Sequence, residues 1–214
     1  MAFPLTHLLV AYEIIARYPR QDADAALLLL GSIAPDAVHY REGFIGGSMS
    51  NIGNAKKITH LCPVSDEKWG AVTDNDGWIN KVKAFAKSHK GPLAEGYAIH
   101  VLTDIYNNIT LWENFRTQHP KEAAKGYKSG YYQDLREIDL RLYQSKVKNS
   151  QIEPLLAKAV ASEMPGLVTA EEIIAIQNNL LCKNYENPTP GYMYRFISYD
   201  ETLRFIQDTA DFIS

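Results

Sequence analysis

The chain has 214 residues, of which 46% are hydrophobic and 22% are charged, as in an ordinary soluble globular protein. Its net charge of −3 argues against a nucleic-acid-binding protein that works through a broad basic surface. This length can bury a sizeable hydrophobic core without disulfides, and we expect a single domain over residues 1–214.

Cysteine usage and the N-terminal segment both indicate a reducing compartment. Cys62 and Cys182 are too few for a disulfide framework. The N-terminal apolar stretch has no positively charged start, is interrupted by Glu13 and Arg17, and lacks the small-residue cleavage site of a signal peptide. The longest purely aliphatic run, residues 27–30, is far below the roughly 20 residues that cross a bilayer. We therefore expect a cytoplasmic protein without a transmembrane segment.

Helical periodicity extends along nearly the whole chain, and alternating β patterns are almost absent. The expected helices span residues 6–18, 22–31, 65–69, 76–88, 92–110 and 120–146, and two later ones start at capping boxes, Thr169 with Glu172 and Ser198 with Glu201. We expect Thr6 to cap the first helix, and Gly126 and Gly130 to be weak points of the longest one. The predicted fold is therefore all-α, a single-domain multi-helix bundle.

Two stretches resist helix formation. Residues 40–57 are rich in Gly, Ser and Asn, and residues 184–197 contain two prolines and three tyrosines. Loops of this length inside a compact domain are uncommon and often form lids or binding loops. We expect both stretches to be long loops, with residues 40–57 forming part of a substrate wall.

His100 and Asp104 lie four residues apart in the apolar segment GYAIHVLTDIYNN, so they share one face of the expected helix. Each polar group taken out of water costs free energy unless it is paired. The pair can chelate one metal ion, or the two side chains can hydrogen-bond to each other. Taken alone, the spacing favours the hydrogen-bonded pair.

Three further residues change this balance. His7 in PLTHLLVAYEI, Asp36 in GSIAPDAVHY and His60 in KKITHLCPV each stand beside apolar residues. Each alone fits a structural role, but imidazole and carboxylate together are the ligands of catalytic zinc. Two divalent cations on two carboxylates and neutral imidazoles would leave a charge of about +2 for hydroxide and an anion such as phosphate. The five residues therefore predict a metal centre that activates water.

The ordered motifs THLLVA, GSIAPDAVH, THL and GYAIHVLTDI resemble the zinc-dependent phospholipase C family, whose all-helical fold is shared by the single-strand-specific zinc nucleases. The resemblance covers about the first half of the chain and implies a bundle of that type. It implies one or two Zn²⁺ ions, or other divalent transition metals, bound by His7, Asp36, His60, His100 and Asp104.

The resemblance also implies a hydrolase of phosphoester bonds, such as a phosphodiesterase, in which metal-activated water attacks the phosphorus. In that hypothesis Asp36 or Asp104 is the general base or a bridging ligand. The expected substrate is a small phosphorylated molecule or a phospholipid headgroup.

The chain departs from the family in two places. The secreted enzymes begin with a tryptophan whose amino group and carbonyl help to bind zinc, whereas this chain begins with Met1. They also have two further histidines and a glutamate at a third metal site. After Asp104 the only histidine here is His119, at an expected helix start. We therefore expect two metal ions or one.

Other polar residues near these motifs each have two interpretations. His39, three residues after Asp36, is either an added ligand or hydrogen-bonding partner of the site, or a surface residue. Cys62 is more simply a small buried apolar residue than a thiolate ligand. Asp134 and Asp139 are expected on a solvated, charged face of the longest helix rather than at the metal site.

Three basic residues flank the first long loop: Arg41, Lys56 and Lys57. They are available to neutralise a phosphate, or they are simply solvated.

Two other function classes compete with a zinc hydrolase. Helical phosphohydrolases that use an adjacent His-Asp dipeptide are disfavoured, because this sequence contains no such dipeptide. The alternative from a different class is a non-catalytic helical protein that keeps a structural metal or a His/Asp hydrogen-bond cluster.

Overall fold

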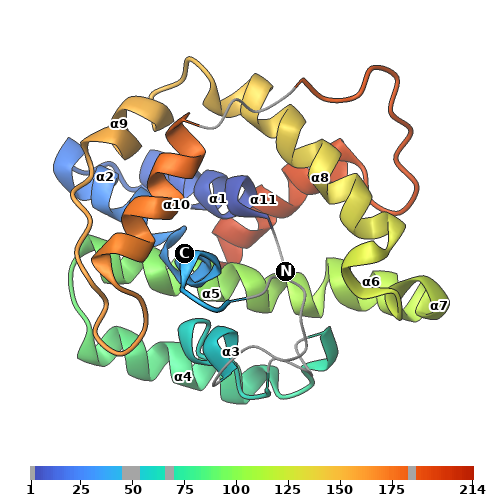
Figure 1. Cartoon of the computed structure of the whole chain (residues 1–214), viewed down its shortest axis with the longest axis horizontal. Helices are drawn as coiled ribbons and strands as arrows, with labels where there is room; N and C mark the ends of the chain where they lie inside the picture. Colours follow the sequence, from blue (N-terminus) through green and yellow to red (C-terminus); the bar gives the residue numbers. More distant parts are fainter. Residues whose placement is uncertain (1–2, 45–53, 66–69, 183–186) are drawn as a thin grey trace.

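The computed structural model describes residues 3–44, 54–65, 70–182 and 187–214, and this part of the chain is all-α (Figure 1). The α-helices are α1 (Pro4–Arg17), α2 (Asp22–Gly31), α3 (Ala55–Thr59), α4 (Asn75–Ser88), α5 (Pro92–Ile109), α6 (Leu111–Gln118), α7 (Pro120–Ala123), α8 (Gly130–Leu142), α9 (Ile152–Lys158), α10 (Ala170–Cys182) and α11 (Tyr199–Ile213). Shorter turns of other helix types are η1 (Ala34–Tyr40), η4 (Gly126–Lys128) and η5 (Tyr143–Val147). Within these ranges the only β pairing is an isolated bridge between Met164 and Val168. The prediction of an all-α multi-helix bundle is confirmed.

Helix α5 lies at the centre of the bundle. The elements that pack against it are α1, α2, α4, α6, α11 and η1 (Figure 1). Apolar residues on several sides of α5 are buried, including Tyr97, Val101 and Ile105. A helix that is apolar nearly all round is a core helix. Its polar residues His100 and Asp104 therefore stand inside the hydrophobic core.

The backbones of α2 and α5 are in close contact at two glycines. A Cβ atom added to Gly31 would lie 2.1 Å from the carbonyl oxygen of Leu93, and one added to Gly96 would lie 2.1 Å from that of Leu28. Only glycine lets two backbones approach this closely. The contact fixes η1, which follows α2 directly, relative to the middle of α5.

The ends of two helices differ from the prediction. The first helix begins at Pro4 with Phe3 as its N-cap, so Thr6 is a buried helical residue and not a cap. Proline suits the first helical position because its φ is fixed at a helical value. The predicted helix over residues 120–146 is divided into α7, η4, α8 and η5. Gly126, with φ 55°, takes the left-handed conformation there and breaks it.

Both predicted late capping boxes are present. The Thr169 hydroxyl accepts from the backbone N–H of Glu172 at 3.2 Å, and the Glu172 carboxylate accepts from the N–H of Thr169 at 3.1 Å. Ser198 and Glu201 make the same reciprocal pair at the start of α11. The sequence prediction missed α6 and α9, which contain eight and seven residues.

The two predicted loops are described in part. In residues 40–57, Ala55–Thr59 forms the short helix α3, so the prediction of a loop throughout is wrong at that end. Residues 187–197 contain no helix or strand, in agreement with the prediction. Residues 45–53, 66–69 and 183–186 lie outside the described residues, and with them most of the predicted helix at residues 65–69.

Asp134 and Asp139 on α8 are both buried, so their predicted place on a solvated face is wrong. Asp134 accepts a hydrogen bond from the Tyr192 hydroxyl and bonds from three successive backbone N–H groups, those of residues 195–197. Asp139 accepts from the backbone N–H of Leu5 at 3.3 Å. Asp134 therefore holds the segment before α11 against α8, and Asp139 holds the start of α1.

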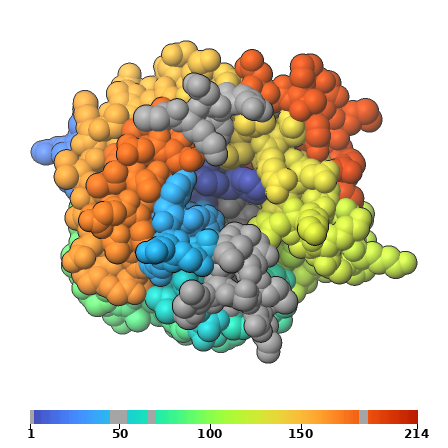
Figure 2. Space-filling view, viewed as in Figure 1, coloured from blue at the N-terminus to red at the C-terminus, as the bar shows by residue number. Residues whose placement is uncertain are grey.

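The surface view shows a hollow over α1. In Figure 2 the dark-blue α1 lies at the floor of this hollow, with the blue η1 segment on one side and the yellow-green chain of α6 to α8 opposite. Across the described ranges, none of the helices is both long and apolar enough to cross a membrane.

Candidate metal centre

The five predicted ligand residues come together in one buried cluster. His7 lies on α1, Asp36 in η1, His60 directly after α3, and His100 and Asp104 on α5. Their exposed fractions are 1%, 5%, 0%, 0% and 2% in that order. The four contributing elements are far apart in sequence, so the cluster is a product of the packing around α5.

Asp104 is at the centre of this cluster. Its Oδ1 lies 3.6 Å from Nε2 of His7, and its Oδ2 lies 3.9 Å from Nε2 of both His60 and His100. On the far side, Oδ1 of Asp36 lies 3.3 Å from Nε2 of His60. Ligand atoms of a tetrahedral zinc ion stand about 3.4 Å apart, given bonds of about 2.1 Å. The separations in the cluster are close to that value.

The donor atoms form two overlapping groups in which all atoms lie within 4.8 Å of one another. One group is His7, His100 and Asp104, and the other is Asp36, His60 and His100. The two carboxylate oxygens of Asp104 face different histidines, as in a carboxylate that bridges two cations. Around His60 and His100, both Asp36 and Asp104 offer carboxylate oxygens to a cation. At His7 only Asp104 and His100 offer further donor atoms, within the described residues.

Hydrogen bonds fix the ring orientation of two histidines. Nδ1 of His100 lies 2.7 Å from the carbonyl oxygen of Ser32, which can only accept, so this nitrogen carries the proton. Nδ1 of His60 lies 2.9 Å from the Thr59 hydroxyl, and Trp78 Nε1–H donates to the His60 carbonyl oxygen at 2.8 Å. Partners of this kind orient metal-binding histidines in proteins. In both rings Nε2 faces the centre of the cluster.

Some buried nitrogens in the cluster have no hydrogen-bond partner. Among the described residues, no hydrogen-bond partner is found for either ring nitrogen of His7. The same holds for Nε2 of His100. The two rings stack with their centroids 3.6 Å apart. Leaving a buried acceptor unsatisfied costs free energy, and native structures rarely do so. A cation bound between the Nε2 atoms of these two rings and Asp104 would satisfy both Nε2 atoms.

The electrostatics of the cluster favour the protonation states that bind metal. Burial lowers the pKa of His60 to about 3, although Asp36 opposes this, and burial together with His100 lowers the pKa of His7. Burial alone would raise the pKa of Asp36, but Lys56 and the neighbouring His39 and His60 outweigh it and hold the pKa well below its usual range. Neutral imidazole and ionised carboxylate are the ligand forms.

These pKa shifts predict an acid-sensitive metal-free protein. Histidine in an unfolded chain has a pKa of about 6.5, so between about pH 6.5 and 3 the unfolded state binds protons that folded His60 does not. Stability is therefore fully present above pH 6.5 and falls as the pH falls, by about 1.4 kcal/mol per pH unit for each such histidine. Urea unfolding of chelator-treated protein at a series of pH values measures this slope.

Two variants test the assignment of that slope. His60→Gln should make it shallower by about one proton, whereas His119→Gln, at an exposed position, should leave it unchanged. A wild-type slope equal to that of His60→Gln would contradict the neutral, buried state of His60.

The sequence placed several other residues near this site, and the structure separates them. His39 and Lys56 lie at its edge, where Nε2 of His39 is 3.9 Å and Nζ of Lys56 is 3.7 Å from Oδ1 of Asp36. Arg41 instead makes a bidentate pair with Glu172 on α10, which raises its pKa and ties it to the bundle. Cys62 is buried and belongs to neither ligand group found in the described ranges.

Lys56, which lies beside the cluster, differs most from its predicted position. It was expected at the end of a loop, but it is 5% exposed on α3, one turn before His60. The spacing of four residues between Lys56 and His60 is the signal that could have indicated it.

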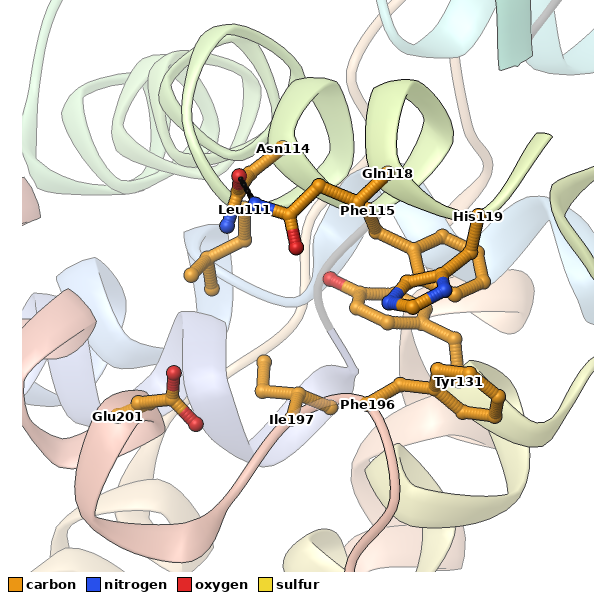
Figure 3. A pocket seen from close by; sticks show the side chains of 9 residues that line it. All are labelled: Leu111, Asn114, Phe115, Gln118, His119, Tyr131, Phe196, Ile197 and Glu201. Carbon is orange, nitrogen blue, oxygen red and sulfur yellow. Dashed lines mark hydrogen bonds between the residues drawn. The ribbon is translucent and has the colours of Figure 1, made fainter.

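A pocket lies apart from the cluster, between α6 and the starts of α8 and α11. Rings of Phe115, Tyr131 and Phe196 line it, and His119 stands at its side (Figure 3). None of the five cluster residues lines this pocket. His119 packs edge-on against Phe196 with ring centroids 5.0 Å apart, as expected for a residue outside the metal site.

Comparison with known proteins gives no match: no family model fits this chain, and neither the curated proteins nor the solved structures include a significant relative.

Proposed function

We propose that this protein is a zinc-dependent hydrolase of phosphoester bonds, of the type found in the zinc-dependent phospholipase C family. The observation that carries the proposal is the buried cluster around Asp104, in which nitrogens of His7 and His100 have no hydrogen-bond partner among the described residues. Three imidazoles and two carboxylates are a donor set that suits zinc.

The five residues fit a divalent ion by geometry as well as by chemistry. Asp36, His60, His100 and Asp104 present donor atoms 3.3 to 3.9 Å apart along the measured edges. A zinc ion held there would lower the pKa of a bound water towards neutrality and polarise a phosphoryl oxygen. The surrounding apolar core excludes bulk water and strengthens electrostatic interactions in the site.

The two aspartates have separate parts in this proposal. Asp104, whose two oxygens are directed at different histidines, would hold cations through both oxygens. Asp36 is held ionised by Lys56, and its Oδ1 lies 3.3 Å from Nε2 of His60, so it would share a cation with that ring and serve as the general base in this proposal. The substrate class is a small phosphorylated molecule or a phospholipid headgroup, entering from the hollow over α1 (Figure 2).

Metal content tests the proposal. Protein purified without chelator should contain one to two zinc ions per chain, and should hydrolyse p-nitrophenyl phosphate or bis-p-nitrophenyl phosphate until a chelator removes the metal. Re-addition of zinc should restore turnover. The proposal fails if no transition metal is present and added zinc does not bind.

A non-catalytic cluster is the second candidate, and the near-complete burial of all five residues favours it. In that case the His and Asp side chains hold a structural ion or simply hydrogen-bond to one another, as His60 and Asp36 do. Zinc-loaded protein that turns over neither ester would support this candidate over the hydrolase.

A further inference from the structure

Lys56 is a buried cation at the edge of the candidate metal centre. Its side chain is 6% exposed, and Nζ lies 3.7 Å from Oδ1 of Asp36. The same Nζ lies 3.3 Å from Nε2 of His39. A buried ammonium group is costly unless charges or hydrogen bonds compensate it, so its place beside these ligand residues needs an explanation.

His39 connects Lys56 to the surface. Its side chain is 39% exposed, whereas those of Lys56 and Asp36 are 6% exposed. The ring lies on η1, which forms one side of the hollow in Figure 2, and its centroid is 5.0 Å from that of Phe44. Lys56 and His39 therefore form a continuous polar arm from the centre towards the protein surface.

Charge balance shows what such an arm would bind. Oδ1 of Asp36 lies 3.7 Å from Nζ of Lys56 and 3.3 Å from Nε2 of His60. A cation bound by Asp36 would therefore weaken the ion pair between Asp36 and Lys56. Two divalent ions and one hydroxide on the two carboxylates, with Lys56, leave the centre with a charge of about +2. A dianion compensates that charge, and a monoanion does not.

We propose that Lys56, positioned by His39, is a phosphate-binding arm of this centre and that it selects terminal, dianionic phosphate groups, so that the substrate class is phosphomonoesters rather than phosphodiesters. This inference rests on the proposed zinc hydrolase. The ammonium group would donate hydrogen bonds to a non-bridging oxygen that a monoester presents with its full charge. A diester carries one negative charge less, so its hydrogen bond with the ammonium group would be weaker.

Inorganic phosphate and a pair of esters test the arm. In zinc-loaded protein, Lys56→Met should weaken the binding of inorganic phosphate at least about tenfold in calorimetric titrations, because a charge-assisted hydrogen bond is lost. It should also lower the ratio of kcat/KM for p-nitrophenyl phosphate to that for bis-p-nitrophenyl phosphate by about tenfold. Lys83→Met, on the exposed side of α4, makes the same change in net charge and should alter neither quantity.

The outcomes separate the arm from the hydrolase. The phosphate-binding role of Lys56 is wrong if the phosphate Kd of Lys56→Met is within twofold of wild type, or if its ratio of kcat/KM for the two esters is unchanged. In that case, zinc binding and turnover would still support the proposed hydrolase. Protein that binds no zinc overturns both. If Lys56→Met does not fold, His39→Ala carries the test: its ring is partly exposed, and phosphate binding should weaken about threefold. An unchanged Kd in that variant also overturns the arm.

Discussion

Replacing Asp104 by asparagine is expected to lower phosphoesterase activity on the order of a thousandfold and to reduce zinc content by at least one ion per chain. Asparagine has nearly the same shape, but it removes the negative charge and turns one oxygen that faces a histidine into an N–H donor. A loss of about 4 kcal/mol of transition-state stabilisation corresponds to that factor in rate. Elemental analysis and steady-state kinetics of the same preparation measure both effects.

Asp134→Asn is the matched control, because Asp134 is also a buried aspartate but lies on α8 and accepts from Tyr192 and from the backbone before α11. It should lower the midpoint of unfolding, since an amide cannot accept all of those donors, and it should keep its zinc. Wild-type zinc content and turnover in Asp104→Asn would contradict a ligand role for Asp104.

How much of the site could be predicted depends on the range of the interactions. The relation between His100 and Asp104 is local, because residues four apart on a helix always share a face. The approach of His7 to within 3.6 Å of Asp104 depends on the packing of α1 against α5, for which no local pattern exists. Only the ordered set of His and Asp in apolar settings indicated it.

The prediction errors have the same origin. Asp134 was expected to be solvated because its sequence neighbours are charged, but the burial comes from a segment about sixty residues further along the chain, with Phe196 N–H donating to it at 2.7 Å. We expect Lys56 at the end of a loop because residues 40–57 are rich in Gly, Ser and Asn, but it lies on α3, which has only five residues and follows Asn54 in a left-handed conformation, φ 54°. Short helices of this kind are stabilised by tertiary contacts rather than by their own sequence.

The close contact of α2 and α5 links the fold to the site. Gly31 ends α2, and the next residue, Ser32, presents the carbonyl oxygen that accepts from Nδ1 of His100 at 2.7 Å. Asp36 follows four residues later in η1. The distance between the two helix backbones therefore sets both the orientation of His100 and the reach of Asp36 towards His60.

Gly96→Ala is accordingly expected to destabilise the protein by about 2 kcal/mol and to weaken zinc binding as well. Alanine has a helix propensity about 1 kcal/mol better than glycine, which favours the variant. Against this, the new Cβ would lie 2.1 Å from the carbonyl oxygen of Leu28, and a backbone atom cannot move aside as a side chain can. Overpacking of this kind costs about 1–3 kcal/mol or more, so the clash wins.

Urea unfolding and zinc titration of Gly96→Ala measure the two effects together. Gly70→Ala is the control, because the nearest side chain that its Cβ would meet among the described residues is Trp112, at 3.4 Å. It should change stability by less than about 1 kcal/mol. The separation of α2 and α5 should rotate His100 away from the Ser32 carbonyl, and zinc affinity should fall by about tenfold, as when an orienting partner is lost. Wild-type stability and zinc affinity in Gly96→Ala would contradict the claim that the contact between α2 and α5 positions the metal centre.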